Sequence, residues 1–164
     1  MKLANLQDLF VKELQDLYDA EHQILRALPK MTQAATAPEL QRAFQEHGAQ
    51  TERHVTRLEQ IFDQIGAKSK GKSCRAMQGL VAEGEEMIKE EADPAVKDAG
   101  LIAAAQRIEH YEIAGYGCAR TYADMLGHHQ AARLLQQTLD EEGLTDKLLT
   151  QLAERVINIE AERA

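Results

Sequence analysis

The sequence predicts an all-α protein in which four long helices form a bundle of two hairpins. Alanine, leucine, glutamate and glutamine are abundant, whereas the 164 residues include only three prolines and no tryptophan, and this composition favours helices. Apolar side chains recur at helical spacing along each long segment. We expect helices over about residues 3–33, 38–65, 75–91, 97–126 and 129–162, of which 75–91 is the short one.

The lengths of the connections predict how these helices pair. Short breaks at Thr36–Pro38 and at Gly127–His129 join consecutive long helices, so each pair should form an antiparallel hairpin. A long connection with its own short helix joins the two hairpins, and Asp93–Pro94 should end that helix because the residue before proline disfavours the α region. Two hairpins with one long crossover form the ferritin-like pattern, although other bundles can share it. We expect one domain spanning residues 1–164.

Composition and charge argue against several classes of function. The net charge of −8 does not suit a nucleic-acid partner. No apolar run approaches the ~20 residues of a membrane-spanning helix, and the N-terminus lacks the apolar block of a signal peptide. We therefore expect a cytoplasmic protein with no membrane partner. Cys74 and Cys118 lack C-x-x-C spacing and should be free thiols in that compartment.

Each long helix carries acids or histidines within its apolar stripe when it is projected at about 100° per residue. A single buried carboxylate usually has an ordinary hydrogen bond in the core, but it is costly unless it has a partner. The same feature on four helices indicates a shared site, whereas His110 points away from it. The polar residues inside or beside the stripes are Glu13 and Glu21 on the first helix, His47, Gln50, Thr51 and His54 on the second, Glu109 and Glu112 on the third, and Glu141, Glu142 and Asp146 on the fourth.

Position along the hairpins brings these polar residues to a similar depth. In the second hairpin Glu112 should face Glu142, and Glu109 should face Asp146. In the first hairpin Glu21 falls at the level of the polar residues of the second helix. Carboxylates this close cannot all remain ionised without a cation. The predicted metal ligands are Glu21, His47, Gln50, Glu109, Glu112, Glu142 and Asp146, with the roles of His54 and Cys74 left open.

Carboxylates with imidazoles facing inward from four helices suit iron or manganese. Bridging carboxylates can hold two metal ions close together, and such a centre can pass electrons to dioxygen or peroxide. The usual bundle supplies a glutamate from each of two helices and Glu-x-x-His from each of the other two. Here Glu109-x-x-Glu112 and Glu142-x-x-x-Asp146 make the pattern recognisable but acid-rich and irregular.

Five stretches of the sequence match a known family. They are LYDAEHQILRALPKM (17–31), the run from His47 through Arg57-Leu58-Glu59, C-x-A-M-x-G-L from Cys74, LIAAAQRIEHYEIAGYG (101–117) and TLDEEGLTDKLL (138–149). Together they resemble the bacterial YciE/YciF family over essentially the whole chain. The resemblance implies a ferritin-like homodimer with a rubrerythrin-like di-iron centre and a ferroxidase or stress-protection role. Gln50 stands where relatives can carry glutamate, and an amide is a weaker ligand for iron.

Three functions are consistent with these features. The first is an oxidoreductase that oxidises Fe(II) with dioxygen or handles peroxide at two iron ions, with manganese as an alternative metal. In it, Glu112 and one acid of the second or fourth helix would bridge the ions, His47 would be the nitrogen donor, and Glu21, Glu109 and Asp146 would be terminal ligands. The second is a non-catalytic structural or stress protein with an empty or singly metallated cavity. The third is a helical interaction module that recruits a partner through the basic loop at 68–72 or through its acidic faces.

Overall fold

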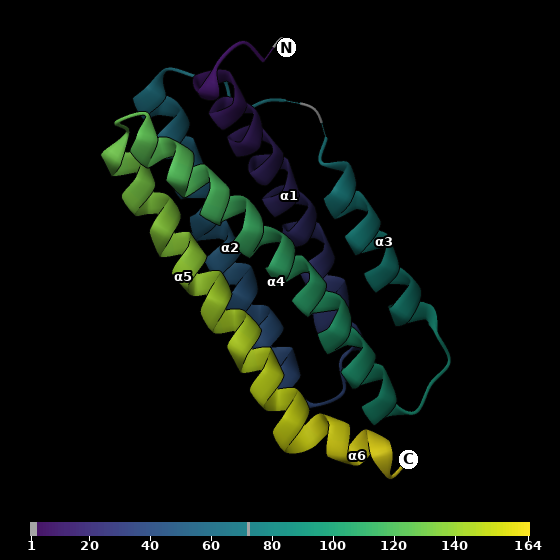
Figure 1. Cartoon of the computed structure of the whole chain (residues 1–164). Helices are drawn as coiled ribbons and strands as arrows, with labels where there is room; N and C mark the ends of the chain where they lie inside the picture. Colours follow the sequence, from purple (N-terminus) through teal and green to yellow (C-terminus); the bar gives the residue numbers. More distant parts are fainter. Residues whose placement is uncertain (1–2, 72) are drawn as a thin grey trace.

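The computed structural model describes residues 3–71 and 73–164 (Figure 1). Lys72 of the expected basic loop and the first two residues of the expected domain lie outside these described residues. Within them all the regular elements are helices, and there is no strand. The elements are α1 (Leu6–Ala34), α2 (Pro38–Ile65), α3 (Arg75–Lys89), α4 (Pro94–Met125), α5 (His129–Leu152), the π-helical turn η1 (Ala153–Ile157) and α6 (Asn158–Glu162).

The four long helices form two antiparallel hairpins, α1–α2 and α4–α5, which confirms the predicted ferritin-like bundle (Figure 1). The hairpins pack against each other through α1 with α4 and through α2 with α5. The crossover between α2 and α4 contains α3, which covers the outside of α1 and α4 (Figure 1). No helix in the described part of the chain has the length and apolarity needed to cross a membrane.

Two predicted helix ends are wrong. Asp93–Pro94 begins α4 and does not end the preceding helix: the Asp93 side chain accepts a hydrogen bond from the Ala95 N–H, and Pro94 takes the first helical position, where its missing N–H costs nothing. The expected helix over 129–162 is interrupted by the π-helical turn, after which α6 bends away from α5 (Figure 1). No proline or glycine marks this break in the sequence.

A polar layer separates two apolar clusters inside the bundle. One cluster contains the C-terminal part of α1 and the N-terminal parts of α2 and α4, with Ile24, Phe44 and Leu101 among its buried side chains. The other lies toward the opposite end and includes Leu17 and Leu58. Among the described residues, the segments of the four long helices between these clusters carry the buried histidines and all the buried acids except Asp98. The apolar clusters therefore hold the polar layer away from solvent at both ends.

Two buried or half-buried aspartates fix the connections around this frame. Asp98 of α4 accepts hydrogen bonds from the Thr36 N–H (2.8 Å), the Thr36 hydroxyl (2.7 Å) and the Ala37 N–H (2.7 Å). These bonds tie the α1–α2 turn to α4. Asp19 of α1 accepts a hydrogen bond from the Cys74 N–H (2.7 Å) at the start of α3. Both contacts satisfy backbone donors that the ends of helices and turns would otherwise leave unpaired.

Candidate metal centre

Six ionisable side chains meet in the polar layer of the bundle. Each is almost fully buried, with at most 3% of its surface exposed. Two of the helices contribute two side chains each. The two residues are seven apart on α2 and three apart on α4, so in each helix both side chains lie on the same face. They are Glu21 of α1, His47 and His54 of α2, Glu109 and Glu112 of α4, and Glu142 of α5.

These side chains form two groups that share one carboxylate. Within each group the potential ligand atoms lie within 4.8 Å of one another. The first group consists of His47, Glu109, Glu112 and Glu142, and the second of Glu21, His54 and Glu142. Glu142 belongs to both groups: its Oε2 lies 4.0 Å from His47 Nε2 and its Oε1 lies 2.9 Å from His54 Nδ1.

Most of the unpaired buried polar atoms in the described residues belong to this cluster. Nine buried side-chain nitrogen or oxygen atoms have no hydrogen bond, and eight of them are in the six residues of the two groups; the ninth is Arg120 Nε. Both oxygens of Glu112 and both of Glu142 are among the eight. Native proteins leave few buried polar groups unpaired unless water, an ion or a ligand satisfies them. The cluster therefore fits the coordination of cations.

His47 is oriented by contacts on its outer side. Its Nδ1 lies 3.3 Å from Gln50 Oε1, and the Thr145 hydroxyl donates to the same oxygen at 3.2 Å. An N–H at Nδ1 leaves a lone pair on Nε2, which lies 3.2 Å from Glu109 Oε1 and 4.0 Å from Glu142 Oε2. Such an outer hydrogen bond fixes the tautomer of a metal-binding histidine.

His54 has the same arrangement with the two nitrogens exchanged. Its Nε2 lies 2.8 Å from Glu141 Oε2, and Arg57 holds both oxygens of Glu141 through two hydrogen bonds of 2.8 Å. The Arg57 guanidinium lowers the pKa of Glu141 to about 2, so this carboxylate is anionic. The inner Nδ1 lies 2.9 Å from Glu142 Oε1 and 3.4 Å from Glu21 Oε1. His54 is thus positioned as a second nitrogen ligand.

Glu21 is held by a buried tyrosine. The Tyr116 hydroxyl donates a hydrogen bond to Glu21 Oε1, while Oε2 has no partner. Next to Tyr116, a Cβ added to Gly115 would come 2.8 Å from Leu17 Cδ2, so α1 and α4 approach closely at this level. This close approach brings Tyr116 of α4 within reach of Glu21 of α1.

Without a cation, protons compensate the charge of the cluster. Burial, assisted by the neighbouring acids, raises the pKa of Glu109 and of Glu112 well above the ordinary value. Burial also acts to raise the pKa of Glu142, but the adjacent imidazoles of His54, 2.9 Å away, and His47 lower it below the ordinary value. For His54, burial opposes the charged form, yet Glu142 and Glu21 raise its pKa to about 10. A binding cation would displace protons from these groups.

The donor set suits two divalent cations. Four carboxylates and two imidazoles are available, and four negative charges balance two divalent ions. Oxygen donors with imidazole favour iron or manganese. The same numbers of carboxylates and histidines occur in the usual di-metal bundle, where each of two helices carries one histidine. Here both histidines lie on α2 and two glutamates lie on α4.

The structure brings five of the seven sequence-predicted ligands into the two groups, and metal ligation by each of them stays a prediction. The five are Glu21, His47, Glu109, Glu112 and Glu142. Gln50 lies behind His47 as the partner of its outer nitrogen. Asp146 belongs to neither group: it accepts a hydrogen bond from Gln106 Nε2 (3.0 Å) and lies 3.3 Å from the exposed His110.

The sequence prediction did not assign His54 as a ligand, although it placed this residue on the apolar face of its helix. A spacing of seven residues puts His47 and His54 two turns apart on one face. That spacing was the available signal. Because α5 presents Glu142 between these two turns, one carboxylate can serve both histidines.

The fold and this cluster define the class of protein as a ferritin-like helical bundle with a buried carboxylate–histidine site. A family model described as a domain of unknown function (DUF892) matches residues 5–162. The chain is 42% identical to Protein YciF of Escherichia coli (strain K12) over 163 residues, which cover 99% of this chain and 98% of YciF. The chain therefore belongs to the YciE/YciF family, as the resemblance of its sequence predicted.

Solved structures agree with this assignment. The crystal structure of the E. coli stress protein YciF matches with a TM-score of 0.92 and 42% identity, over 94% of this chain and 98% of that chain. YcfI of Rhodopseudomonas palustris, described as a proposed structural protein, matches with a TM-score of 0.88 and 40% identity, over 91% and 95% of the respective chains. Both similarities extend over nearly the whole bundle.

Proposed function

We propose that the protein is a two-metal stress protein that oxidises Fe(II) with dioxygen or peroxide, with manganese as an alternative to iron. The observation that carries the proposal is the pair of ligand groups sharing Glu142, which contain eight of the nine unpaired buried polar atoms. A relative with 42% identity is described as a stress protein, which supports the proposed role in the stress response.

Each proposed ligand has a defined place. His47, Glu109 and Glu112 would hold one ion, His54 and Glu21 would hold the other, and Glu142 is within reach of both groups. Fe(II) ions bound as substrate supply the electrons: two Fe(II) and two protons convert dioxygen to hydrogen peroxide, or convert peroxide to two waters. The chain contributes charge compensation, fixed ligand orientation and exclusion of water from the buried layer.

Metal analysis and anaerobic Fe(II) titration test this proposal. The metal-free protein should take up two Fe(II) per chain, and oxidant should then convert them to Fe(III). Glu112→Gln should reduce uptake and oxidation while the helical circular dichroism stays unchanged. Glu46→Gln is the matched control, because Glu46 is exposed and adjacent to His47 on α2. Uptake well below two ions per chain after anaerobic loading would refute a two-metal centre.

A non-catalytic structural role is the second candidate, and the description of YcfI as a proposed structural protein favours it. The two candidates differ in the outcome of one assay. A structural protein would gain stability from bound metal but would not accelerate oxidation of Fe(II) over buffer. Stopped-flow measurement of Fe(III) formation in the presence and absence of protein separates them.

The proposal also includes a homodimer in the cytoplasm. Leu144 and Leu148 lie one turn apart on α5 and are 64% and 40% exposed, so a dimer contact through this face of α5 would remove both from water. Sedimentation equilibrium should give twice the chain mass, and Leu144→Asp with Leu148→Asp should give the chain mass. A wild-type protein that sediments as a monomer at all concentrations contradicts the dimer.

A further inference from the structure

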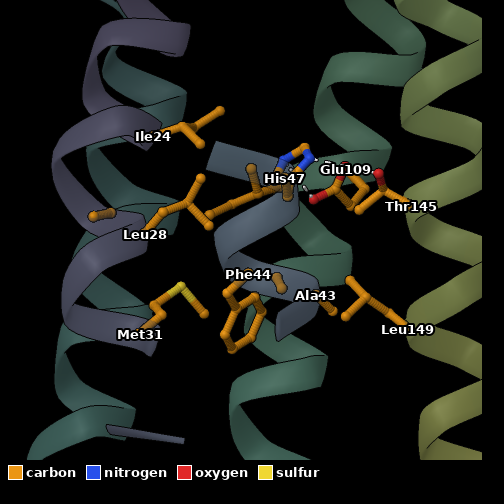
Figure 2. Close-up of a pocket in the computed structure, with 12 residues that line it drawn as sticks. Ile24, Leu28, Met31, Ala43, Phe44, His47, Glu109, Thr145 and Leu149 are labelled. Carbon is orange, nitrogen blue, oxygen red and sulfur yellow. Dashed lines mark hydrogen bonds and ion pairs between the residues drawn. The ribbon is translucent and has the colours of Figure 1, made fainter. Parts of the chain in front are cut away.

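An interior cavity lies beside the metal-site residues His47 and Glu109, enclosed by side chains of α1, α2, α4 and α5 (Figure 2). Its volume is about 10 Å³. All twelve residues that line it are buried, with at most 7% of their surface exposed. The cavity is therefore part of the core and opens onto the candidate metal centre.

The lining is apolar except where it meets the metal site. Nine of the twelve lining residues are aliphatic, aromatic or sulfur-containing, and the other three are His47, Glu109 and Thr145. The Thr145 hydroxyl is already engaged, since Gln50 Oε1 and the Glu141 carbonyl oxygen both lie 3.2 Å away and either can accept its one hydrogen bond. Figure 2 shows His47 and Glu109 close together on one side of the cavity and Phe44 on the other. Polar contact is thus offered only by the metal-binding side chains.

Size and polarity together restrict what can occupy this space. A cavity of this volume holds about one water-sized molecule, so an organic substrate or a second protein does not fit. Water and hydrogen peroxide need several hydrogen-bond partners, and an apolar lining denies them most of these. Dioxygen is small, apolar and forms no obligatory hydrogen bonds, so it loses nothing on leaving water.

We propose that this cavity receives dioxygen and presents it to metal ions held at His47 and Glu109. The oxidant that reaches the metal centre through the cavity is therefore dioxygen and not peroxide. The inference rests on the proposed function, because it names the oxidant of the same centre. The electrons still come from two Fe(II) ions, and dioxygen with two protons leaves as hydrogen peroxide.

A surface groove gives a route to the cavity. The groove lies between α1 and α2, has a volume of about 490 Å³ and shares Leu28 and Phe44 with the lining of the cavity. These two side chains are therefore a wall between the groove and the interior. A change of rotamer at Leu28, which is 6% exposed, would open the path on the fast timescale of side-chain motion.

The first test uses dioxygen itself as the probe of the metal-free protein. Dissolved dioxygen is paramagnetic and broadens the NMR signals of methyl groups close to it. Methyl signals of Ile24, Ile108 and Leu149, which line the cavity, should broaden several-fold more than those of Leu58 and Ile61, which are equally buried in the other apolar cluster. Equal broadening at the two places would overturn the proposal.

The second test fills the cavity. Ala105→Val adds two methyl groups to the lining, and Ala104→Val is the matched control, because Ala104 is a buried neighbour on α4 that does not line the cavity. Ala105→Val should abolish the excess broadening, retain Fe(II) stoichiometry, slow oxidation by dioxygen several-fold and leave oxidation by peroxide unchanged. Ala104→Val should behave as the wild type in all four measurements.

The outcomes separate this inference from the proposed function. An Ala105→Val protein that binds metal, loses the broadening and still oxidises Fe(II) with dioxygen at the wild-type rate refutes delivery through the cavity. Equal slowing with dioxygen and with peroxide refutes it as well. If neither oxidant acts on the metal-loaded wild type, the proposed function is wrong, and the methyl broadening alone decides whether the cavity takes dioxygen.

Discussion

Replacing Glu112 by methionine should stabilise the metal-free protein and weaken its metal binding. Glu112 is fully buried, and neither of its carboxylate oxygens has a hydrogen bond. Each unsatisfied buried polar group costs about 1–3 kcal/mol, while a substitution that conserves side-chain volume costs less than about 1.5 kcal/mol. The expected net gain is about 1–4 kcal/mol, the range seen when buried charges are replaced by apolar groups of similar volume.

Thermal denaturation followed by circular dichroism measures this gain after removal of metal with a chelator. For a chain of this size, each kcal/mol should raise the melting temperature by about 2–4 °C. Added Mn(II) should raise the melting temperature of the wild type more than that of Glu112→Met, because at a given concentration a ligand that binds more tightly stabilises the folded state more. Glu46→Met at an exposed site on α2 should change the stability by less than about 0.5 kcal/mol. A metal-free Glu112→Met protein that melts below the wild type, with full stabilisation by Mn(II), would refute the reasoning.

Three further predictions follow from the same contacts. The metal-free protein should lose stability as pH rises above about 4.3, the unfolded pKa of glutamate, because burial raises the pKa of Glu109 and Glu112, and the folded state then holds more protons than the unfolded state. His54, with its pKa raised to about 10, adds a further loss of stability between about pH 6.5 and pH 10. Urea denaturation should therefore have a higher midpoint at about pH 5 than at about pH 8. A midpoint that rises from pH 5 to pH 8 would contradict this. Glu141→Gln should weaken metal affinity by about 10–100-fold in competition titration, because it frees the outer nitrogen of His54, and unchanged affinity would exclude that orienting role. Asp98→Ala should cost about 2–4 kcal/mol in urea denaturation through its three lost hydrogen bonds without changing metal stoichiometry, and a cost below about 0.5 kcal/mol would contradict this anchoring.

Much of the fold could be predicted from the sequence because the signals are local. The bounds of α2 at Pro38 and Ile65 follow from a proline at the first helical position and from Gly66, which has a φ of 65° at the helix end. The start of α4 is not predicted correctly, because Asp93–Pro94 can either follow the end of one helix or begin the next. The π-helical turn after Leu152 depends on how the last turns pack against α4, which no local pattern records.

The residues of the buried carboxylate–histidine cluster were predictable to the accuracy of a helical turn. Projection gives the face of a helix well, so all six clustered residues were placed on the inner faces. Depth along a hairpin is less certain: a shift of one turn is about 5.4 Å. This is enough to bring Glu142 close to Glu109, where the sequence predicts Asp146. The cavity beside His47 depends on the volumes of twelve side chains from four helices, and spacing in a sequence contains no such information.

A crystal structure of the iron- or manganese-loaded protein, with anomalous data collected at the metal edge, tests the two-metal centre most directly. The account predicts two anomalous peaks about 3.5–4 Å apart, on either side of the Glu142 carboxylate, one beside His47 and the other beside His54. A fully loaded crystal with no peak in the polar layer, or with peaks bound only by Asp146 and other surface residues, would contradict it.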